Sequence, residues 1–301
     1  MTRKELSFTS HGITCAAWHI PATSTAFERR SGRPCVVLAH GFGGTRDTGL
    51  LSYAESFAAA GLDAFVFDYR GFGDSEGTPR QLISYRGQRQ DYHAAIDAAR
   101  RLPGVDPDRI ALWGTSYSAG HAIAVAAQSR RIAAVVSLTP ATDGLASLAS
   151  IARKDGVGRL ARLAAQGLAD AATVITGGRP RMVPIVGQPG STAMITVTGA
   201  EEAYTSFAGP TWRNEIGARH ALEVARNRPT IYAEQVTCPV LVQIGEADRV
   251  VPVAAAHRMA RKLGDHAVVK EYPVDHFDVY DGVWQRRALT DQLEFFGRVL
   301  R

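Results

Sequence analysis

Short apolar runs alternate with longer helical stretches through the first 140 residues, and this alternation limits the possible folds more than any other feature. Runs such as residues 34–39 and 63–68 are mostly apolar without a period of two, which is typical of strands buried on both faces. Helical stretches follow them, at residues 46–60 and 84–102. Strands that alternate with helices at this spacing predict a parallel sheet covered by helices on both faces. The chain is therefore predicted to have an α/β fold.

The alternation stops at Thr139-Pro140 and resumes near Cys238. Between these points the sequence is rich in Ala and helical in pattern, with a second helix expected at residues 212–226. We therefore predict a core domain formed by residues 1–140 and 236–301. Residues 141–235 are predicted to form an insertion between two strands of the same sheet.

Composition and charge exclude several classes of protein. Of the 301 residues, 46% are hydrophobic and 21% are charged, as in a folded chain rather than a disordered one. The net charge is +5, but basic residues are interleaved with acidic ones, so we expect no nucleic-acid partner. The densest basic stretch, which contains Arg153, Lys154, Arg159 and Arg162, is interpreted as a solvated helix face; contact with an anionic surface or substrate is the alternative.

Membrane segments and cysteine sites are not expected either. No window approaches the roughly 20 apolar residues of a membrane span. The first ten residues do not resemble a signal peptide, so a cytoplasmic location is predicted. Cys15, Cys35 and Cys238 are far apart and lie in strand-like runs, which predicts neither disulfides nor a metal site. We expect the protein to need no metal and no cofactor.

A serine follows a predicted strand at a sharp turn. In the sequence Gly114-Thr115-Ser116-Tyr117-Ser118, a strand ends and a helix begins, so Ser116 would project its Oγ toward the helix N-terminus. Such a turn requires small residues two positions before and after the nucleophile. Gly114 and Ser118 satisfy this, although glycine is usual at the second position. Because a serine stands where glycine is usual, Ser118 remains an alternative nucleophile. The strand is expected to end at Gly114, however, and the sharp turn must follow it directly, which favours Ser116.

A serine nucleophile needs a base and a carboxylate that orients the base. His276 is the histidine that follows a terminal strand in a loop, so it is predicted to be the base. Asp248 lies in the loop after the strand ending at Ile244, at the sheet edge where active sites of parallel sheets assemble. Glu246 in the same loop is the rival candidate for this carboxylate.

The oxyanion of an acyl-transfer intermediate also needs hydrogen-bond donors. The sequence His40-Gly41-Phe42-Gly43-Gly44 follows a buried strand, and its glycines let the backbone approach a substrate closely. The backbone N–H groups of Phe42 and Tyr117 are therefore predicted to form the oxyanion hole. A phosphate-binding loop is excluded, because no Gly-Lys-Ser/Thr follows these glycines.

These motifs together resemble the α/β-hydrolase superfamily. The resemblance covers about residues 4–140 and 236–300, and it includes Tyr69-Arg70-Gly71-Phe72-Gly73-Asp74-Ser75 besides the motifs above. Within the superfamily the chain is similar to cocaine-esterase, dienelactone-hydrolase and X-prolyl-peptidase-like members, and to related polyketide acyltransferases. The resemblance implies a mostly parallel eight-stranded sheet, a Ser-His-Asp triad, and a helical cap (lid) formed by residues 141–235.

The leading hypothesis is a serine hydrolase that cleaves a carboxylic ester or thioester of a small-molecule acyl substrate. An acyltransferase, in which an alcohol or amine replaces water, is the alternative, and a non-catalytic binding protein of the same fold is a third. We expect Leu160, Leu163 and Leu168 of the insertion to shape the acyl site. The sequence leaves open whether the chain forms homo-oligomers.

Overall fold

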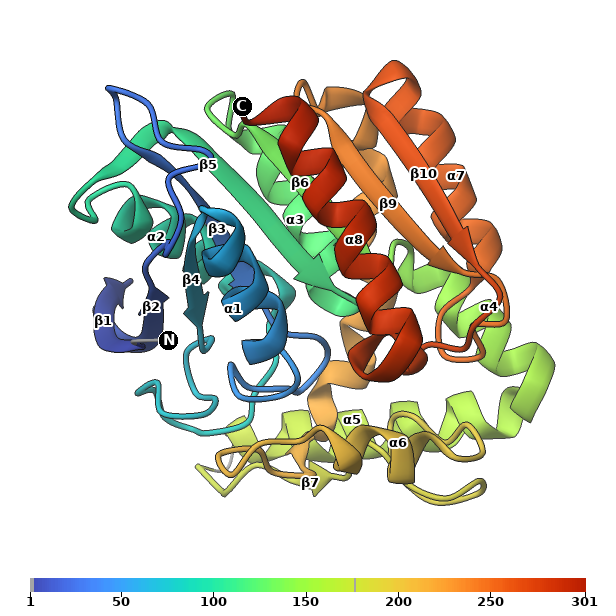
Figure 1. Ribbon diagram of the computed structural model, residues 1–301. Coiled ribbons are helices and arrows are strands. Elements are labelled where there is room, and N and C mark those ends of the chain that lie inside the picture. The colour runs from blue at the N-terminus through green and yellow to red at the C-terminus, as the bar shows by residue number, and fades with distance from the viewer. Residues whose placement is uncertain (1–2, 176) are drawn as a thin grey trace.

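The computed structural model describes residues 3–175 and 177–301 and contains one large sheet (Figure 1). Eight strands follow the order β1-β2-β4-β3-β5-β6-β9-β10. The pairs β1–β2 and β2–β4 are antiparallel, and the remaining neighbours are parallel. The strands are β1 (Lys4–Ser10), β2 (Ile13–Ile20), β3 (Arg33–Ala39), β4 (Asp63–Phe67), β5 (Val105–Thr115), β6 (Ala134–Leu138), β9 (Val240–Gly245) and β10 (Ala267–Tyr272).

Helices cover both faces of this sheet, as the alternation predicts. On one face, α1 (Leu51–Ala60) and α8 (Gly282–Val299) pack against side chains such as Val36 and Trp113. On the other face, Val37 and Leu112 contribute to a second core together with three further helices. These are α2 (Tyr85–Ala99), α3 (Tyr117–Gln128) and α7 (Val253–Leu263). Successive side chains of a strand point to opposite faces, so the continuous apolar runs fill both cores at once.

Two predicted helices differ from the structure. The helix expected at residues 46–60 begins only at Leu51, because the backbone N–H of Arg46 donates to Asp68 Oδ1 at 2.6 Å and the chain turns there. The helix expected at residues 212–226 does not form. The first half of this stretch instead contains the short strand β8 (Ile216–Gly217), where Gly217 N donates to the carbonyl of Gln81 at 2.9 Å, and only two short 3₁₀ helices follow it. Pairing with a distant loop therefore overrides the local helical pattern.

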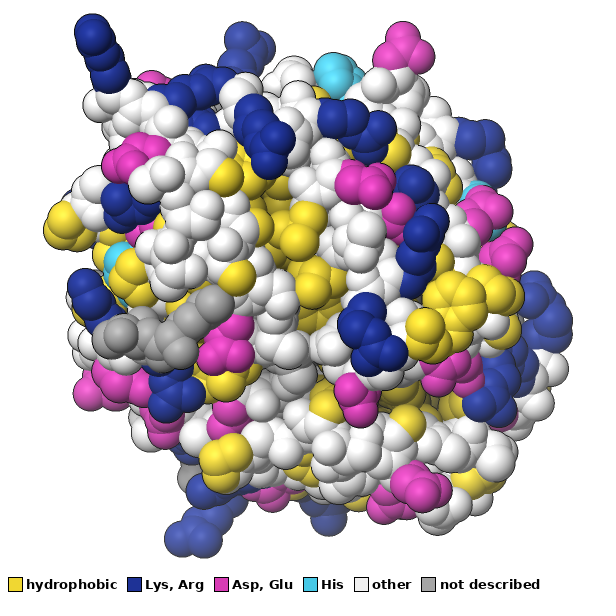
Figure 2. All heavy atoms as spheres, in the orientation of Figure 1, with side chains coloured by type: hydrophobic (Ala, Val, Ile, Leu, Met, Phe, Trp, Pro, Cys, Tyr) yellow, Lys and Arg dark blue, Asp and Glu magenta, His cyan; other side chains and the backbone are white. Residues whose placement is uncertain are grey.

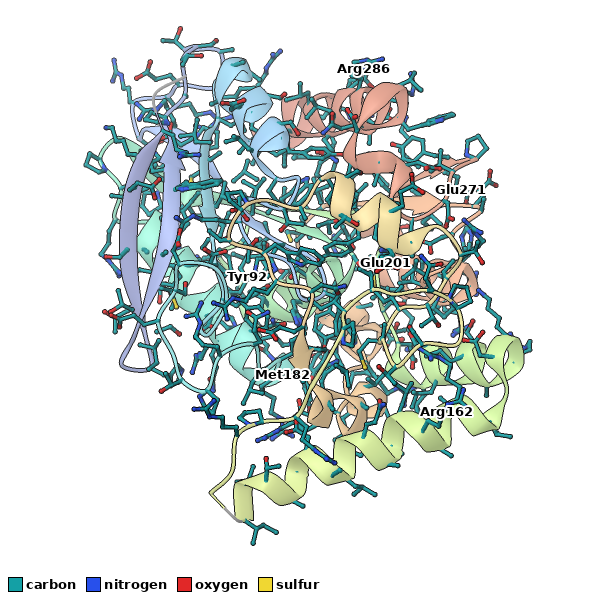
Figure 3. All side chains as sticks on the ribbon, turned by 90° about the horizontal axis from the view of Figure 1, so that it is seen from below. Tyr92, Arg162, Met182, Glu201, Glu271 and Arg286 are labelled. Atoms are coloured by element: carbon teal, nitrogen blue, oxygen red, sulfur yellow. The ribbon has the colours of Figure 1, made fainter. Side chains whose placement is uncertain are left out.

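The segment between β6 and β9 crosses the carboxyl ends of the parallel strands (Figure 1). Seen from below, its helices and the stretch that carries Met182 and Glu201 extend across the sheet edge (Figure 3). The two ends of this segment pack closely on each other, since a Cβ added to Gly144 would lie 1.7 Å from the carbonyl oxygen of Val224. Its elements are α4 (Gly144–Asp155), α5 (Val157–Ile175), β7 (Met182–Val183), α6 (Ala200–Ser206), β8, and the 3₁₀ helices η1 (Ala218–Leu222), η2 (Val224–Arg226) and η3 (Pro229–Gln235).

Acidic and basic side chains are interspersed on the face shown in Figure 2. Within residues 3–175 and 177–301, no helix has the length and apolar character needed to cross a bilayer. Cys15, Cys35 and Cys238 are free and buried. Burial raises the pKa of Cys15 to about 12, so this thiol stays protonated at neutral pH.

Candidate active site

Ser116 lies on the sharp turn between β5 and α3. Its φ of 53° and ψ of −113° are a strained conformation for a residue with a side chain. The turn is tight enough to require glycine nearby, because a Cβ added to Gly114 would lie 2.2 Å from the carbonyl oxygen of Ser118. A serine held in this way at the end of a strand has the geometry of a nucleophile elbow.

Loops at the ends of two further strands bring a histidine and a carboxylate to this serine. His276 Nε2 lies 2.9 Å from Ser116 Oγ, and His276 Nδ1 lies 2.6 Å from Asp248 Oδ2. The other oxygen of Asp248 accepts from the backbone N–H groups of Val250 and Val251, each at 2.8 Å. The side chains of His276 and Asp248 are each only 2% exposed, so water does not compete for these hydrogen bonds.

Two backbone N–H groups next to Ser116 have no acceptor. Among the described residues, neither Phe42 N nor Tyr117 N donates a hydrogen bond. The loop that carries Phe42 is close to the serine, since a Cβ added to Gly41 would lie 3.3 Å from Ser116 Cβ. Tyr204 of α6 supports this loop by donating its hydroxyl to the carbonyl of Phe42 at 2.9 Å. Free donors at this position are what a developing oxyanion requires.

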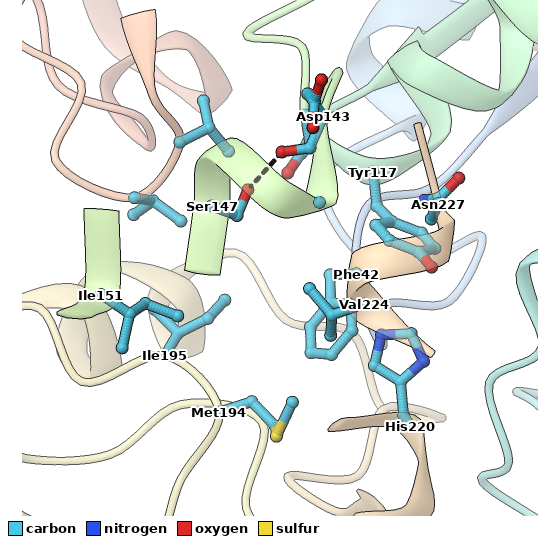
Figure 4. A pocket seen from close by; sticks show the side chains of 15 residues that line it. Phe42, Tyr117, Asp143, Ser147, Ile151, Met194, Ile195, His220, Val224 and Asn227 are labelled. Atoms are coloured by element: carbon cyan, nitrogen blue, oxygen red, sulfur yellow. Dashed lines mark hydrogen bonds between the residues drawn. The ribbon is translucent and has the colours of Figure 1, made fainter. Parts of the chain in front are cut away.

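A pocket of about 130 Å³ opens onto Ser116 (Figure 4). Its walls come from the elbow, the Phe42 loop, the loop after β9 and, for the largest part, the segment between β6 and β9. Apolar side chains dominate one side, where Ile151, Met194 and Ile195 lie together in Figure 4. Tyr117, His220 and Asn227 line the other side.

Known proteins are similar to this chain in sequence and in architecture. Residues 30–274 match the model of the family described as serine aminopeptidase, S33. The chain belongs to this family. It is 37% identical to the quorum-quenching protein AidA of Acinetobacter baumannii, over 98% of this chain and 95% of that protein. It is 28% identical to polyketide transferase ATR5 of Stachybotrys chlorohalonatus, over 100% of this chain and 99% of that protein.

A solved structure confirms the predicted fold. The crystal structure of the α/β hydrolase GrgF from Penicillium has a TM-score of 0.83 to this chain, with 22% identity and coverage of 100% and 99% of the two chains. The α/β-hydrolase fold predicted from the sequence is therefore confirmed, as is the resemblance to hydrolases and polyketide acyltransferases.

In this S33 family member the rival site residues lie apart from His276. Ser118 Oγ is fully buried, where it bonds the hydroxyl of Tyr69 at 2.7 Å and the carbonyl of His40. The side chain of Glu246 is exposed, and its carboxylate forms no hydrogen bond with the described residues. The structure thus brings Ser116 and Asp248, not these two alternatives, to the histidine.

The leucines expected to shape the acyl site do not line the pocket. Leu163 is buried within the insertion, and Leu168 is 62% exposed. Leu160 is partly buried and also lies outside the pocket lining. The helical period of this stretch identifies its apolar face, but that face packs mainly on η1 rather than toward Ser116.

Sequence reasoning missed three polar side chains near the site, namely Tyr204, His220 and Asn227. All three lie in the inserted segment, where no motif marks them. Burial lowers the pKa of His220 to about 4, so its imidazole is neutral at pH 7. Burial likewise lowers the pKa of His40, at the start of the Phe42 loop, to about 4. Neither histidine has a hydrogen-bonded carboxylate of the kind that His276 has.

No group of three or more His, Cys, Asp or Glu side chains within residues 3–175 and 177–301 is arranged to hold a metal ion. The site described above instead offers a serine, a histidine, a carboxylate and free backbone donors. These are the groups that nucleophilic acyl transfer requires.

Proposed function

We propose that this protein hydrolyses a carboxylic ester or thioester through an acyl-enzyme on Ser116. The observation that carries the proposal is the hydrogen-bonded series Ser116–His276–Asp248 at a strained strand–helix turn. The family membership supports it, because this is a family of serine hydrolases.

Each group has a definite part in the proposed reaction. Ser116 Oγ attacks the acyl carbon while its proton passes to His276 Nε2, and the N–H groups of Phe42 and Tyr117 bind the oxyanion. The bond to the alcohol or thiol then breaks, and this leaving group takes the proton from His276. Water, deprotonated by His276, attacks the acyl-enzyme and releases the carboxylic acid and free Ser116. Asp248 holds the imidazole in the required tautomer and orientation.

We also propose that residues 141–235 act as a cap that selects substrates, over a core of residues 1–140 and 236–301. The pocket lining supports this, because Ile151, Met194, Ile195 and Val224 all belong to the insertion. Apolar walls of this kind govern which acyl chain fits rather than the attack on its carbonyl.

Shortening one of these walls should change the preferred acyl length. We expect Ile151→Ala to raise kcat/KM for octanoyl relative to butanoyl esters by about 10-fold, since each extra buried methylene contributes about 0.8 kcal/mol. The measurement is kcat/KM over a series of p-nitrophenyl esters. Leu168→Ala, a truncation outside the pocket, is the matched control and should leave the ratio unchanged. An equal effect on all chain lengths would contradict a selecting cap.

Acyl transfer is the second candidate, and a specific observation favours it. A relative that aligns over the whole chain is named a polyketide transferase. The same catalytic residues would serve, with an alcohol or amine in place of water. The quorum-quenching name of the Acinetobacter relative suggests a further substrate: a bacterial signal molecule with an ester, thioester or lactone bond.

One panel tests these proposals together. Purified protein is incubated with aryl esters, alkyl thioesters and lactones, with and without added alcohols and amines, and before and after exhaustive chelation. We expect turnover of at least one ester class, unaffected by chelation, with release of the free acid. Dominant formation of the new ester or amide would favour the transferase.

A quorum-sensing reporter tests the signal substrate. The wild-type protein should abolish the reporter signal, and the Ser116→Ala variant should not. No turnover of any class would contradict the proposed function.

A further inference from the structure

Arg89 on α2 is a buried cation that forms no ion pair. It is only 6% exposed. Its Nη2 donates to Asn227 Oδ1 at 2.6 Å and its Nε donates to His121 Nδ1 at 3.3 Å, so both acceptors are neutral groups. Its guanidinium carbon lies 5.2 Å from the ring centroids of Tyr85 and Tyr232. Among the described residues no carboxylate forms an ion pair with it. A charge is costly to bury without an opposite charge, so its presence here needs a physical reason.

The acidic side chains of the same region are engaged with other arginines. Burial raises the pKa of Glu223, and the cations that act on its carboxylate are Arg226 and Arg86. Asp91 of α2 accepts from the Nε of Arg70 at 2.7 Å. The region around the buried cation therefore keeps a net positive charge.

Both hydrogen-bond acceptors of Arg89 contact Tyr117, the residue that follows Ser116. The ring of His121 meets the ring of Tyr117 edge-on, with 4.7 Å between the centroids. The Tyr117 hydroxyl interacts with the side chain of Asn227, and the two residues lie on one wall of the pocket (Figure 4). Burial raises the pKa of this hydroxyl, whereas the charge of Arg89 acts in the opposite direction, so the field of the cation reaches Tyr117. The backbone N–H of Tyr117 is one of the two free donors beside Ser116.

We propose that Arg89 is a positioning residue for the reaction at Ser116. Its two hydrogen bonds hold the neighbours of Tyr117 in place, and its charge stabilises the oxyanion that forms beside the Tyr117 N–H. The inference rests on the proposed ester or thioester hydrolysis. The attack converts a neutral carbonyl into an oxyanion, so a fixed cation favours the transition state over the bound substrate. Because the side chain is shielded from water, salt screens its field only weakly.

Replacement of the cation by a neutral side chain tests this. We expect Arg89→Met to lower kcat/KM for a p-nitrophenyl ester about 10-fold, the effect of a unit charge about 10 Å away at an effective dielectric constant of about 20. An alkyl boronic acid, which forms an anionic tetrahedral adduct with a serine Oγ, should bind about 10-fold more weakly for the same reason. The carboxamide with the same chain is neutral and should bind within about twofold of wild type.

Two further substitutions at this position separate charge from shape. Arg89→Lys keeps the charge and should restore kcat/KM to within about threefold of wild type. Arg89→Gln is a second neutral variant, which serves if Arg89→Met does not fold, and it should show the same loss as Arg89→Met. Thermal unfolding and titration of Ser116 with an organophosphonate give the amount of folded, reactive protein in each case.

Arg109→Met is the matched control. Arg109 is also buried, at 7% exposed, and it donates to backbone carbonyls, including that of Phe27 at 3.0 Å, near the start of β5 and away from Ser116. Loss of this cation should leave the ratio of boronic acid to carboxamide affinity unchanged, even where it lowers thermal stability.

Three results would overturn the inference while leaving the ester hydrolase intact. They are an equal loss of kcat/KM in Arg89→Lys and Arg89→Met, an equal weakening of the boronic acid and the carboxamide, and the same change of their ratio in Arg109→Met. Absence of turnover of every ester by the wild type would overturn the proposed function and this inference with it.

Discussion

Replacement of Ser116 by alanine is expected to lower kcat/KM for ester hydrolysis by about 10⁴- to 10⁶-fold, the range seen when a serine nucleophile is removed. Ser116 Oγ is the atom that lies 2.9 Å from His276 Nε2, and no other described hydroxyl bonds that nitrogen. The measurement is single-substrate kinetics with a short aryl ester, together with covalent labelling by an organophosphonate, which should disappear. Thermal unfolding should show an intact fold, because the change removes one oxygen at the surface of the pocket.

Ser118→Ala is the matched control for this experiment. Its hydroxyl bonds Tyr69 and the carbonyl of His40, so its loss should affect support of the Phe42 loop but leave phosphonate labelling in place. We expect a reduction in kcat/KM of about 10-fold or less, since one neutral hydrogen bond is removed. If Ser118→Ala were inactive while Ser116→Ala still reacted with the phosphonate, the assignment of the nucleophile would be wrong.

Replacement of Asp248 by asparagine is expected to lower kcat by about 10⁴-fold. An asparagine can present its amide N–H to His276 Nδ1, which favours the tautomer that places the proton on Nε2 and removes the base from Ser116. The change preserves shape, so KM and thermal stability should move far less than kcat. The measurement is kcat over the pH range in which the protein stays folded.

Glu246→Gln is the control for Asp248, because it makes the same change of carboxylate to amide two residues away. The Glu246 side chain is exposed and its carboxylate hydrogen-bonds no described residue, so we expect activity within about twofold of wild type. A large loss in Glu246→Gln with little effect of Asp248→Asn would show that the carboxylate was assigned to the wrong residue.

The pattern of apolar runs was sufficient to predict the core of this protein. The period of a strand or helix is a property of a few consecutive residues, so β3 and β4 could be recognised within one residue of their bounds. The elbow could be recognised for the same reason, because strand, turn glycine and helix are all local. The loops that follow parallel strands all lie at the same edge of the sheet, at the carboxyl ends of the strands. Asp248 and His276 could therefore be nominated from their positions in such loops alone.

The sequence by itself therefore determined the α/β-hydrolase fold and nominated a short set of candidate catalytic residues. The tertiary structure alone decided which of them meet: Ser116 rather than Ser118, and Asp248 rather than Glu246. It alone showed that residues 212–226 are not one helix and that Leu160, Leu163 and Leu168 lie outside the pocket. The reason is that these outcomes depend on contacts between distant segments, as between Arg89 and Asn227, 138 residues apart, and such contacts leave no periodic signal in the chain.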